Sequence, residues 1–495
     1  MDHRTKLPHV RQDFAASVVV FLVALPLCVG VAVASGVPAE LGLITGIVGG
    51  LVTGMMRGSS LQVSGPAAGL TVLVFEAVQT FGLPALGVIV LAAGLLQLAM
   101  GALKLGRWFR AISVAVVEGM LAGIGLMIIA GQLYAAAGLK APVSGLGKIA
   151  GLPEVLVEAA FSTRALVSLA VGAGTIAVLV LWKRMPSRVR AVPGAPAAVV
   201  LATLASLVFS PPIATVEVRG LLGAVQAPGP DAFGELASVS MLGTVLAFTL
   251  IASAESLFSA AAVDRLHDGP RTEYDKELMA QGAGNAVCGL LGALPMTAVI
   301  VRSSANVQAG AKTKASRILH GVWLLLFAAL LPSVLGLIPL PALAGILIHA
   351  GWRLIPLRTI ASLWREHRGE ALILLVTAVA IVAVNMFEGV LIGLALSVAK
   401  TAWDGSHVKL EVIDKGAGPV QAHLSGNATF LRLPKILDSL EALPRDRPIE
   451  LNLSGLHHLD HACRVALENW STRHSSDGTE SVRVTELTGG KVTQS

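Results

Sequence analysis

Long apolar stretches alternate with short polar connections along most of the chain, and most of them are long enough to cross a bilayer as a helix. A polar, basic leader of residues 1–13 precedes the first stretch, and we expect it to stay in the cytoplasm. The pattern predicts fourteen spans, at residues 14–35, 41–56, 66–80, 85–103, 111–131, 164–182, 192–209, 241–262, 277–293, 301–311, 316–334, 339–352, 370–386 and 388–402.

Two stretches, residues 62–70 and 294–304, break this pattern, because proline, glycine and hydroxyl residues interrupt them where a span is expected. A backbone leaves the helix at membrane depth only where protein or a water-filled cavity satisfies its polar groups. Breaks at corresponding places in two halves of a chain are typical of a transporter's substrate site at the membrane midplane. The N-termini of the half-helices carry partial positive charge and free N–H groups, which suit an anion.

The distribution of basic residues tests the predicted number and direction of the spans. With the N-terminus inside, twenty-two Lys and Arg residues face the cytoplasm and only four (Lys140, Lys148, Arg164 and Arg219) face outward, as the positive-inside rule requires. Each interrupted stretch then opens the third of seven spans, in a first repeat (14–209) and a second repeat (241–402). Because seven is odd, the repeats are inverted, and the two half-helix N-termini are expected to face each other near the midplane.

The composition changes after residue 407, where the pattern predicts a small cytosolic α/β domain over 407–495. Strands are predicted at 408–413, 448–453 and 481–487, and helices at 430–440 and 459–470. This region has no glycine-rich phosphate loop and no catalytic constellation, so we interpret it as regulatory or assembly-related.

Composition narrows the class of protein. Hydrophobic residues make up 54% and charged residues 14% of the chain, so lipid rather than water solvates most of it. The net charge of +6 reflects basic residues at span ends, which gives no reason to expect a nucleic acid partner. The three cysteines form no metal or disulfide pattern, and no nucleophile–base pair is evident. We therefore predict a membrane protein that is not an enzyme and needs no cofactor beyond a coupling ion.

Several motifs, taken together and in order, resemble the sulfate permease (SulP) family of inorganic-anion transporters. They are Ala24-Leu25-Pro26, Ala34-Ser35-Gly36-Val37-Pro38, Val63-Ser64-Gly65-Pro66, Glu255-Ser256-Leu257, Arg302-Ser303-Ser304-Ala305-Asn306 and Gly310-Ala311-Lys312-Thr313. The C-terminal region, with Leu453-Ser454-Gly455 and Leu459-Asp460-His461-Ala462, resembles the family's STAS domain. The resemblance implies a uracil-permease-like fold of seven plus seven spans, with a core domain that moves against a gate domain, in a homodimer.

Within the family, Ala24-Leu25-Pro26-Leu27 and His461-Ala462-Cys463 resemble a bacterial branch that is often associated with carbonic anhydrases. This favours bicarbonate over sulfate as the substrate. It also leaves open a carbonic anhydrase or another cytosolic partner at the STAS domain. Leu27 stands where many relatives have glutamine, so one polar contact to the anion is missing. Ala67 stands where they often have threonine, so a hydroxyl available to sodium is missing at Ala67.

The candidate substrate site combines the beginnings of both half-helices. Its residues are Ser64, Gly65, Pro66 and Ala67 at one end, and Ala298, Ile300, Val301 and Arg302 at the other. Most of them would offer backbone groups to the anion, whereas Arg302 would supply positive charge, since its guanidinium does not deprotonate.

Glu255 is the candidate site for a coupling cation. A lone carboxylate in mid-span costs roughly 2.5–3.5 kcal/mol, so Glu255 should face a cavity or a partner and hold a proton or sodium. Ser259, one helical turn later, would add an oxygen ligand for a sodium ion near Glu255 and Ser259. A purely structural ion pair between Glu255 and Arg302 is an alternative reading.

The sequence thus predicts secondary active transport of a small inorganic anion across a bacterial inner membrane, with both termini cytoplasmic. Bicarbonate is the first choice and sulfate the second. Sodium or a proton would drive an elevator-like alternating-access movement. Two alternatives stay open: an uncoupled anion exchanger or channel, and a membrane anchor whose STAS domain recruits a soluble partner.

Overall fold

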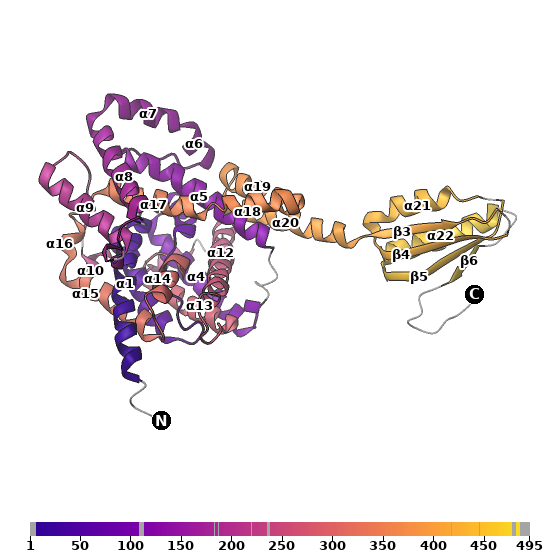
Figure 1. Ribbon diagram of the computed structural model, residues 1–495, viewed down its shortest axis with the longest axis horizontal. Coiled ribbons are helices and arrows are strands. Elements are labelled where there is room, and N and C mark those ends of the chain that lie inside the picture. The colour runs from indigo at the N-terminus through magenta and orange to yellow at the C-terminus, as the bar shows by residue number, and fades with distance from the viewer. Residues whose placement is uncertain are drawn as a thin grey trace. The chain divides into compact units, whose positions relative to one another are not determined.

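The computed structural model describes residues 6–485 except 108–112, 183, 187, 219, 235–237, 417, 445 and 478–481. Residues Met1–Leu394 form one compact unit and residues Ala395–Ser495 form a second (Figure 1). The first unit is helical, and a small mixed sheet with two helices makes up most of the second.

Each of the fourteen predicted spans coincides with a helix. The first seven are α1 (Lys6–Ala34), α2 (Ala39–Val48) with a π-helical turn η2 (Gly49–Thr53), α3 (Thr71–Phe81), α4 (Leu83–Ala102), α5 (Val114–Ala136), α8 (Thr163–Trp182) and α9 (Gly194–Phe209). The second seven are α12 (Val239–Asp264), α13 (Tyr274–Leu290), α14 (Ile300–Gln308), α15 (Ala315–Leu330), α17 (Leu340–Leu354), α19 (Arg368–Ala383) and α20 (Met386–Gly405). Among the described residues, seven helical stretches are long and apolar enough to cross a membrane unaided.

The described residues of the first unit also form six shorter helices, which lie in connections with no predicted element, except that the one at 332–335 overlaps the end of the span predicted at 316–334. They are α6 (Gly145–Ala150), α7 (Leu152–Phe161), α10 (Leu221–Ala224), α11 (Pro230–Gly234), α16 (Pro332–Leu335) and α18 (Leu357–Glu366). The pattern misses them because they are short or amphipathic, so they give no continuous apolar run.

Several membrane helices pack in two groups. In one group, α4 packs against α12 and α13; in the other, α5 packs against α17 and α19, and α17 also packs against α8. Glycines allow the closest of these approaches: a Cβ atom at Gly94 of α4 would lie 2.4 Å from the backbone nitrogen of Ala286 in α13. Substituting a larger residue there would push the two helices apart.

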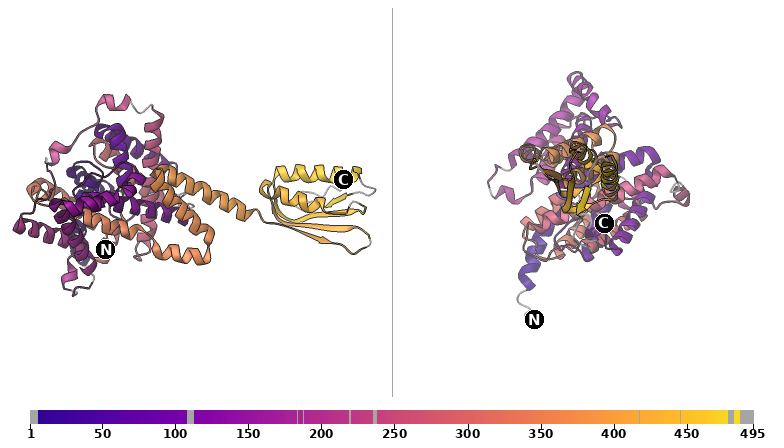
Figure 2. Two further views of the ribbon diagram at one scale, coloured as in Figure 1. Left: turned by 90° about the horizontal axis from the view of Figure 1, so that it is seen from above. Right: turned by 90° about the vertical axis from the view of Figure 1, so that its right-hand side faces the viewer.

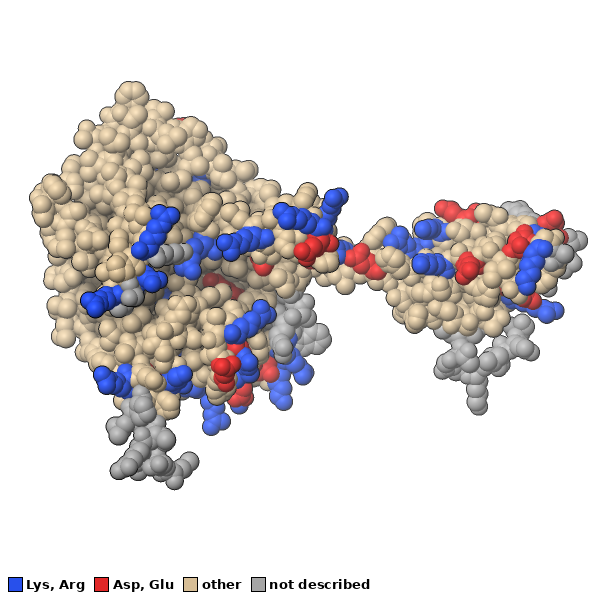
Figure 3. All heavy atoms as spheres, in the orientation of Figure 1, with Lys and Arg blue, Asp and Glu red and all other residues tan. Residues whose placement is uncertain are grey.

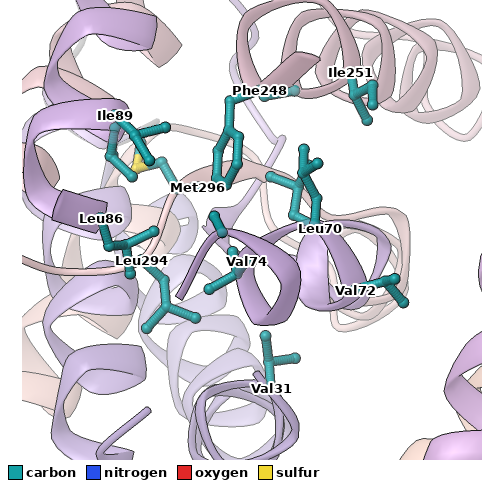
Figure 4. Close-up of a cluster of buried hydrophobic side chains, with 14 of the residues drawn as sticks. Val31, Leu70, Val72, Val74, Leu86, Ile89, Phe248, Ile251, Leu294 and Met296 are labelled. Atoms are coloured by element: carbon teal, nitrogen blue, oxygen red, sulfur yellow. The ribbon is translucent and has the colours of Figure 1, made fainter. Parts of the chain in front are cut away.

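A buried apolar cluster surrounds the first half-helix. Leu70, Val72 and Val74 lie among side chains from α4, α12 and the second interrupted stretch, including Phe248 and Met296 (Figure 4). Outside this core, the surface of the first unit carries exposed leucines and valines along α9, such as Leu204 and Val208. Figure 3 shows broad uncharged surfaces, with most charged side chains of this face gathered in a belt and at its lower edge. Such a surface suits lipid.

The second unit contains a four-stranded sheet in the order β3-β4-β5-β6, formed by β3 (Val408–Ile413), β4 (Val420–Ala428), β5 (Ile449–Leu459) and β6 (Val482–Thr485). Strand β3 is antiparallel to β4, whereas β4–β5 and β5–β6 are parallel. Helices α21 (Leu433–Glu441) and α22 (His461–Asp477) cover one face of the sheet (Figure 2).

Strand β4 is the element of this domain that the sequence pattern missed. Its buried side chains are Val420, Ala422, Leu424 and Ala428, and two of these are alanines. Because small residues give a weak alternating signal, and Ser425, Gly426 and Asn427 indicate a turn, the segment reads as a loop. The remaining strands and both helices match the predicted α/β order.

Candidate anion-binding site

The two interrupted stretches meet as a short antiparallel strand pair. Strand β1 (Ser64–Pro66) pairs with β2 (Met296–Ala298), with Ser64 opposite Ala298 and Pro66 opposite Met296. Beyond the pair, the Val299 N–H donates to the Val63 carbonyl at 3.0 Å. Ser64 of the first repeat and Ala298 of the second are thus joined, as facing breaks require.

A half-helix begins at each end of this strand pair. The first starts as a 3-10 turn, η3 (Ala68–Leu70), and continues as α3; the second is α14. Neither Ala67 nor Val299, the residues before these helices, makes a side-chain capping hydrogen bond. Apart from the Leu70 N–H, which donates to the Ala67 carbonyl, first-turn N–H groups therefore remain available for an anion at both helix starts.

The predicted substrate-site residues are brought together by this arrangement. Ser64, Gly65 and Pro66 form β1, Ala67 follows it, Ala298 ends β2, and Ile300, Val301 and Arg302 form the first turn of α14. The side chains of Ile300 and Val301 are exposed, whereas Ala67 and Ala298 are buried. The Ser64 hydroxyl is already engaged, because it accepts a hydrogen bond from Gln281 Nε2 at 2.8 Å.

Arg302 lies buried against the first interrupted stretch. Its Nη2 donates to the Pro66 carbonyl at 3.2 Å, and its Nε and Nη1 have no hydrogen-bond partner among the described residues. A Cβ atom on Gly65 would lie 2.1 Å from Nη1, so the guanidinium packs directly against the glycine backbone. Two buried donors of a permanent cation are therefore left for another acceptor.

Glu255 reaches the other half-helix. Its carboxylate oxygens lie 2.7 and 2.8 Å from the position of a Cβ atom on Gly69, which is in the turn that opens the first half-helix. Oε2 is buried and has no hydrogen-bond partner among the described residues. The alternative ion pair with Arg302 is wrong, because Arg302 contacts Pro66 and Gly65 while Glu255 lies at Gly69. Ser259 is buried one turn further along α12.

Polar residues that sequence reasoning did not assign to the site hold the strand pair in place. Ser256 Oγ accepts from the Ala298 N–H at 3.2 Å, and its carbonyl accepts from Gln62 Nε2 at 2.9 Å. Glu277, Gln281 and Asn285 recur every fourth residue along α13 in a predicted span. That spacing places them on one helix face, and it was a usable signal in the sequence.

The fold and site define a class: a multi-pass helical membrane protein with two inverted repeats whose broken helices meet, as in membrane transporters. Residues 10–377 match the family model described as the sulfate permease family, and the chain belongs to that family. Because the family and its named relatives are transporters, the prediction that this protein is an anion transporter and not an enzyme is confirmed.

Two relatives illustrate the likeness in sequence. The chain is 29% identical over 397 residues to the putative sulfate transporter YvdB of Bacillus subtilis, over 79% of this chain and 73% of that protein. It is 27% identical over 361 residues to the bicarbonate transporter BicA of Picosynechococcus, over 69% of this chain and 61% of that protein. The match therefore spans less than two thirds of BicA.

The fold extends the likeness to nearly the whole chain. The solved overall structure of SLC26A9 matches with a TM-score of 0.79 at 15% identity, covering 97% of this chain and 85% of that one. The match confirms the predicted fold class, and the C-terminal α/β region is consistent with the STAS domain that the sequence resembles.

Proposed function

We propose that this protein imports a small inorganic anion, with bicarbonate as the first choice and sulfate as the second. The observation that carries the proposal is the strand pair β1–β2, which places two uncapped half-helix starts beside the unpartnered donors of Arg302. Helix N-termini and a guanidinium are both ligands of oxyanions. The names of the relatives support these two anions.

Glu255 would couple anion uptake to a cation. A buried carboxylate oxygen without a partner, at the opening turn of a half-helix, is costly unless it is protonated or binds a cation. Sodium would take Glu255 and Ser259 as oxygen ligands, and a proton would need Glu255 alone. Ala67 supplies no hydroxyl, which favours the proton.

An elevator-like movement would carry the site across the membrane. Strand β2 contacts α12 and α13, and η3 contacts α12, so this packing group can move as a body with the site attached. The movement would slide η3 past α5 and α17, which it also contacts. The group of α5, α8, α17 and α19 would remain fixed, in a homodimer. We place the protein in a bacterial inner membrane with both termini in the cytoplasm.

Uptake of radiolabelled bicarbonate and sulfate by the purified protein in liposomes tests the proposal. Proton and sodium gradients are imposed in turn. We expect one cation gradient to drive concentrative uptake, and Glu255→Gln to abolish that dependence. Glu158→Gln, which changes an exposed carboxylate of α7, is the matched control and should behave as the wild type. Gradient-driven uptake that persists in Glu255→Gln would refute the coupling role.

An uncoupled anion exchanger is the second candidate, because Ala67 weakens the case for sodium and coupling would then rest on the proton of Glu255 alone. Without a hydroxyl at Ala67, the described residues offer sodium a sparse set of oxygen ligands around Glu255 and Ser259. In that case, labelled bicarbonate would enter only liposomes loaded with a second anion, and neither cation gradient would change the rate.

A further inference from the structure

Three buried polar side chains form a stripe along one face of α13. Glu277, Gln281 and Asn285 are each 1% exposed or less, and they lie four residues apart. Each one contacts an interrupted stretch or the loop before it: Glu277 Oε2 accepts from the Ser59 N–H at 2.8 Å, and Gln281 donates to Ser64 Oγ at 2.8 Å. Asn285 makes the most extensive contact of the three.

Asn285 binds both backbone groups of Met296, the first residue of β2. Its Oδ1 accepts from the Met296 N–H at 2.7 Å, and its Nδ2 donates to the Met296 carbonyl at 3.1 Å. These are the two bonds that a residue of a neighbouring antiparallel strand would make. The Ala298 N–H, two residues along and on the same edge, goes instead to Ser256. Side chains therefore satisfy the outer edge of β2.

The orientation of the Asn285 carboxamide is fixed by two further buried residues. Its Nδ2 also donates to Gln97 Oε1 of α4 at 2.7 Å, and Gln97 Nε2 donates to Ser253 Oγ of α12 at 3.1 Å. Gln97 and Ser253 are fully buried. The network therefore links α4, α12 and α13 to the strand that leads into the second half-helix, and each bond has its donor and acceptor matched.

We propose that Asn285 is a positioning residue for the anion, because its carboxamide takes the place of a third strand along the outer edge of β2. It holds Met296, and α14 begins four residues later at Ile300, so the placement of the first-turn N–H groups depends on this contact. The residue itself lies behind the strand and does not touch the anion. The inference rests on the proposed function, since it concerns the affinity of that same site.

Asn285→Ala in the full-length protein tests the proposal with two readouts. Hydrogen–deuterium exchange should rise in peptides that contain residues 294–300, because the Met296 N–H loses its acceptor. The KM of the transported anion should rise about tenfold, which corresponds to about 1.4 kcal/mol, whereas the maximal rate should change less. Gln132→Ala is the matched control, since it removes a buried carboxamide from α5, in the other packing group. It should change neither readout.

Gln97→Leu separates positioning from general stability. Because Gln97 reaches β2 through Asn285, its effect on KM should be smaller, and it should disappear when Asn285→Ala is already present. Unchanged exchange over 294–300, or an unchanged KM with a lower maximal rate, would overturn the proposal. A wild type that moves neither bicarbonate nor sulfate would contradict the proposed function instead, and the exchange readout would still decide the role of Asn285.

Discussion

The half-helices α3 and α14 begin at opposite ends of one strand pair, but different kinds of contact hold them. Around α3 the contacts are apolar: Leu70 and Val74 are almost fully buried in the cluster that contains Phe248 (Figure 4). Around α14 they are hydrogen bonds. Ser303 Oγ accepts from the Val63 N–H at 2.9 Å, and Asn306 Nδ2 donates to the Leu61 carbonyl at 2.9 Å.

Three side chains of α14 make hydrogen bonds to the extended chain that precedes α3. These bonds satisfy backbone groups between residues 61 and 66, which have no helix of their own. Irregular backbone at membrane depth needs such partners. The polar half-helix therefore supports the backbone of the other repeat, while the apolar one is held by packing. Disturbing the first should alter the site, and disturbing the second should alter stability.

The largest expected effect is on the apolar side. Phe248→Ala removes a fully buried ring beside α3 and should lower the free energy of unfolding by about 3–5 kcal/mol, with little change in the KM of the anion. Denaturation in detergent and uptake by reconstituted protein measure the two quantities. Phe161→Ala, at an exposed position of α7, is the control and should cost less than about 0.5 kcal/mol. A large change in KM with an unchanged free energy of unfolding would contradict the proposal that the contacts around α3 serve stability rather than the site.

Gly65→Ala disturbs the contact between Gly65 in the first interrupted stretch and Arg302 in the second. The added methyl group would overlap Arg302 Nη1, so the guanidinium or β1 must shift, which costs about 1–3 kcal/mol. We expect anion uptake to fall by about tenfold or more at low substrate concentration. Gly174→Ala in α8 is the control, because a Cβ atom there meets no heavy atom within 4 Å. Equal uptake by both variants would show that anion uptake does not depend on the position of the Arg302 guanidinium.

The sequence predicted the spans and their breaks because hydrophobicity and helix-breaking residues are local signals. The start of α14 was placed at 301 and lies at Ile300, and the start of α3 was placed at 66, before the 3-10 turn that precedes Thr71. The resemblance to the sulfate permease family and the inverted order of the spans were confirmed. Local patterns are enough for such features.

Local sequence patterns could not predict which residues of one repeat hydrogen-bond to residues of the other. Ser303 and Val63 are 240 residues apart, and no periodicity reveals that the serine hydroxyl accepts from that N–H. The same limit explains why Glu255 was paired in one reading with Arg302, although its carboxylate lies against Gly69. Opposite charges in two spans suggest an ion pair, but the orientation of the spans decides which groups meet.

Ser303→Ala tests the polar side with a smaller change. It removes the acceptor of the Val63 N–H and leaves that buried group unsatisfied, which costs about 1–3 kcal/mol. We expect the rise in KM, expressed as a free energy, to exceed the loss of unfolding free energy, because the displaced backbone leads into β1. Ser304→Ala, at the partly exposed neighbouring position, serves as the control. If Ser303→Ala lowered only the unfolding free energy, the two half-helices would not differ in the proposed way.

Arg302→Lys gives the smallest expected change and separates charge from geometry. Lysine keeps the positive charge near Gly65, but it loses the planar donors and the bond to the Pro66 carbonyl. If the lysine ammonium donates to the anion in place of the free guanidinium N–H groups, the loss is that of the bond to Pro66 alone, about 0.5–1.5 kcal/mol, and KM rises by about two- to tenfold. Arg302→Gln removes the charge as well and should lower uptake further. Equal KM values for the two variants would mean that Arg302 serves β1 alone, and that the half-helix N–H groups bind the anion without it.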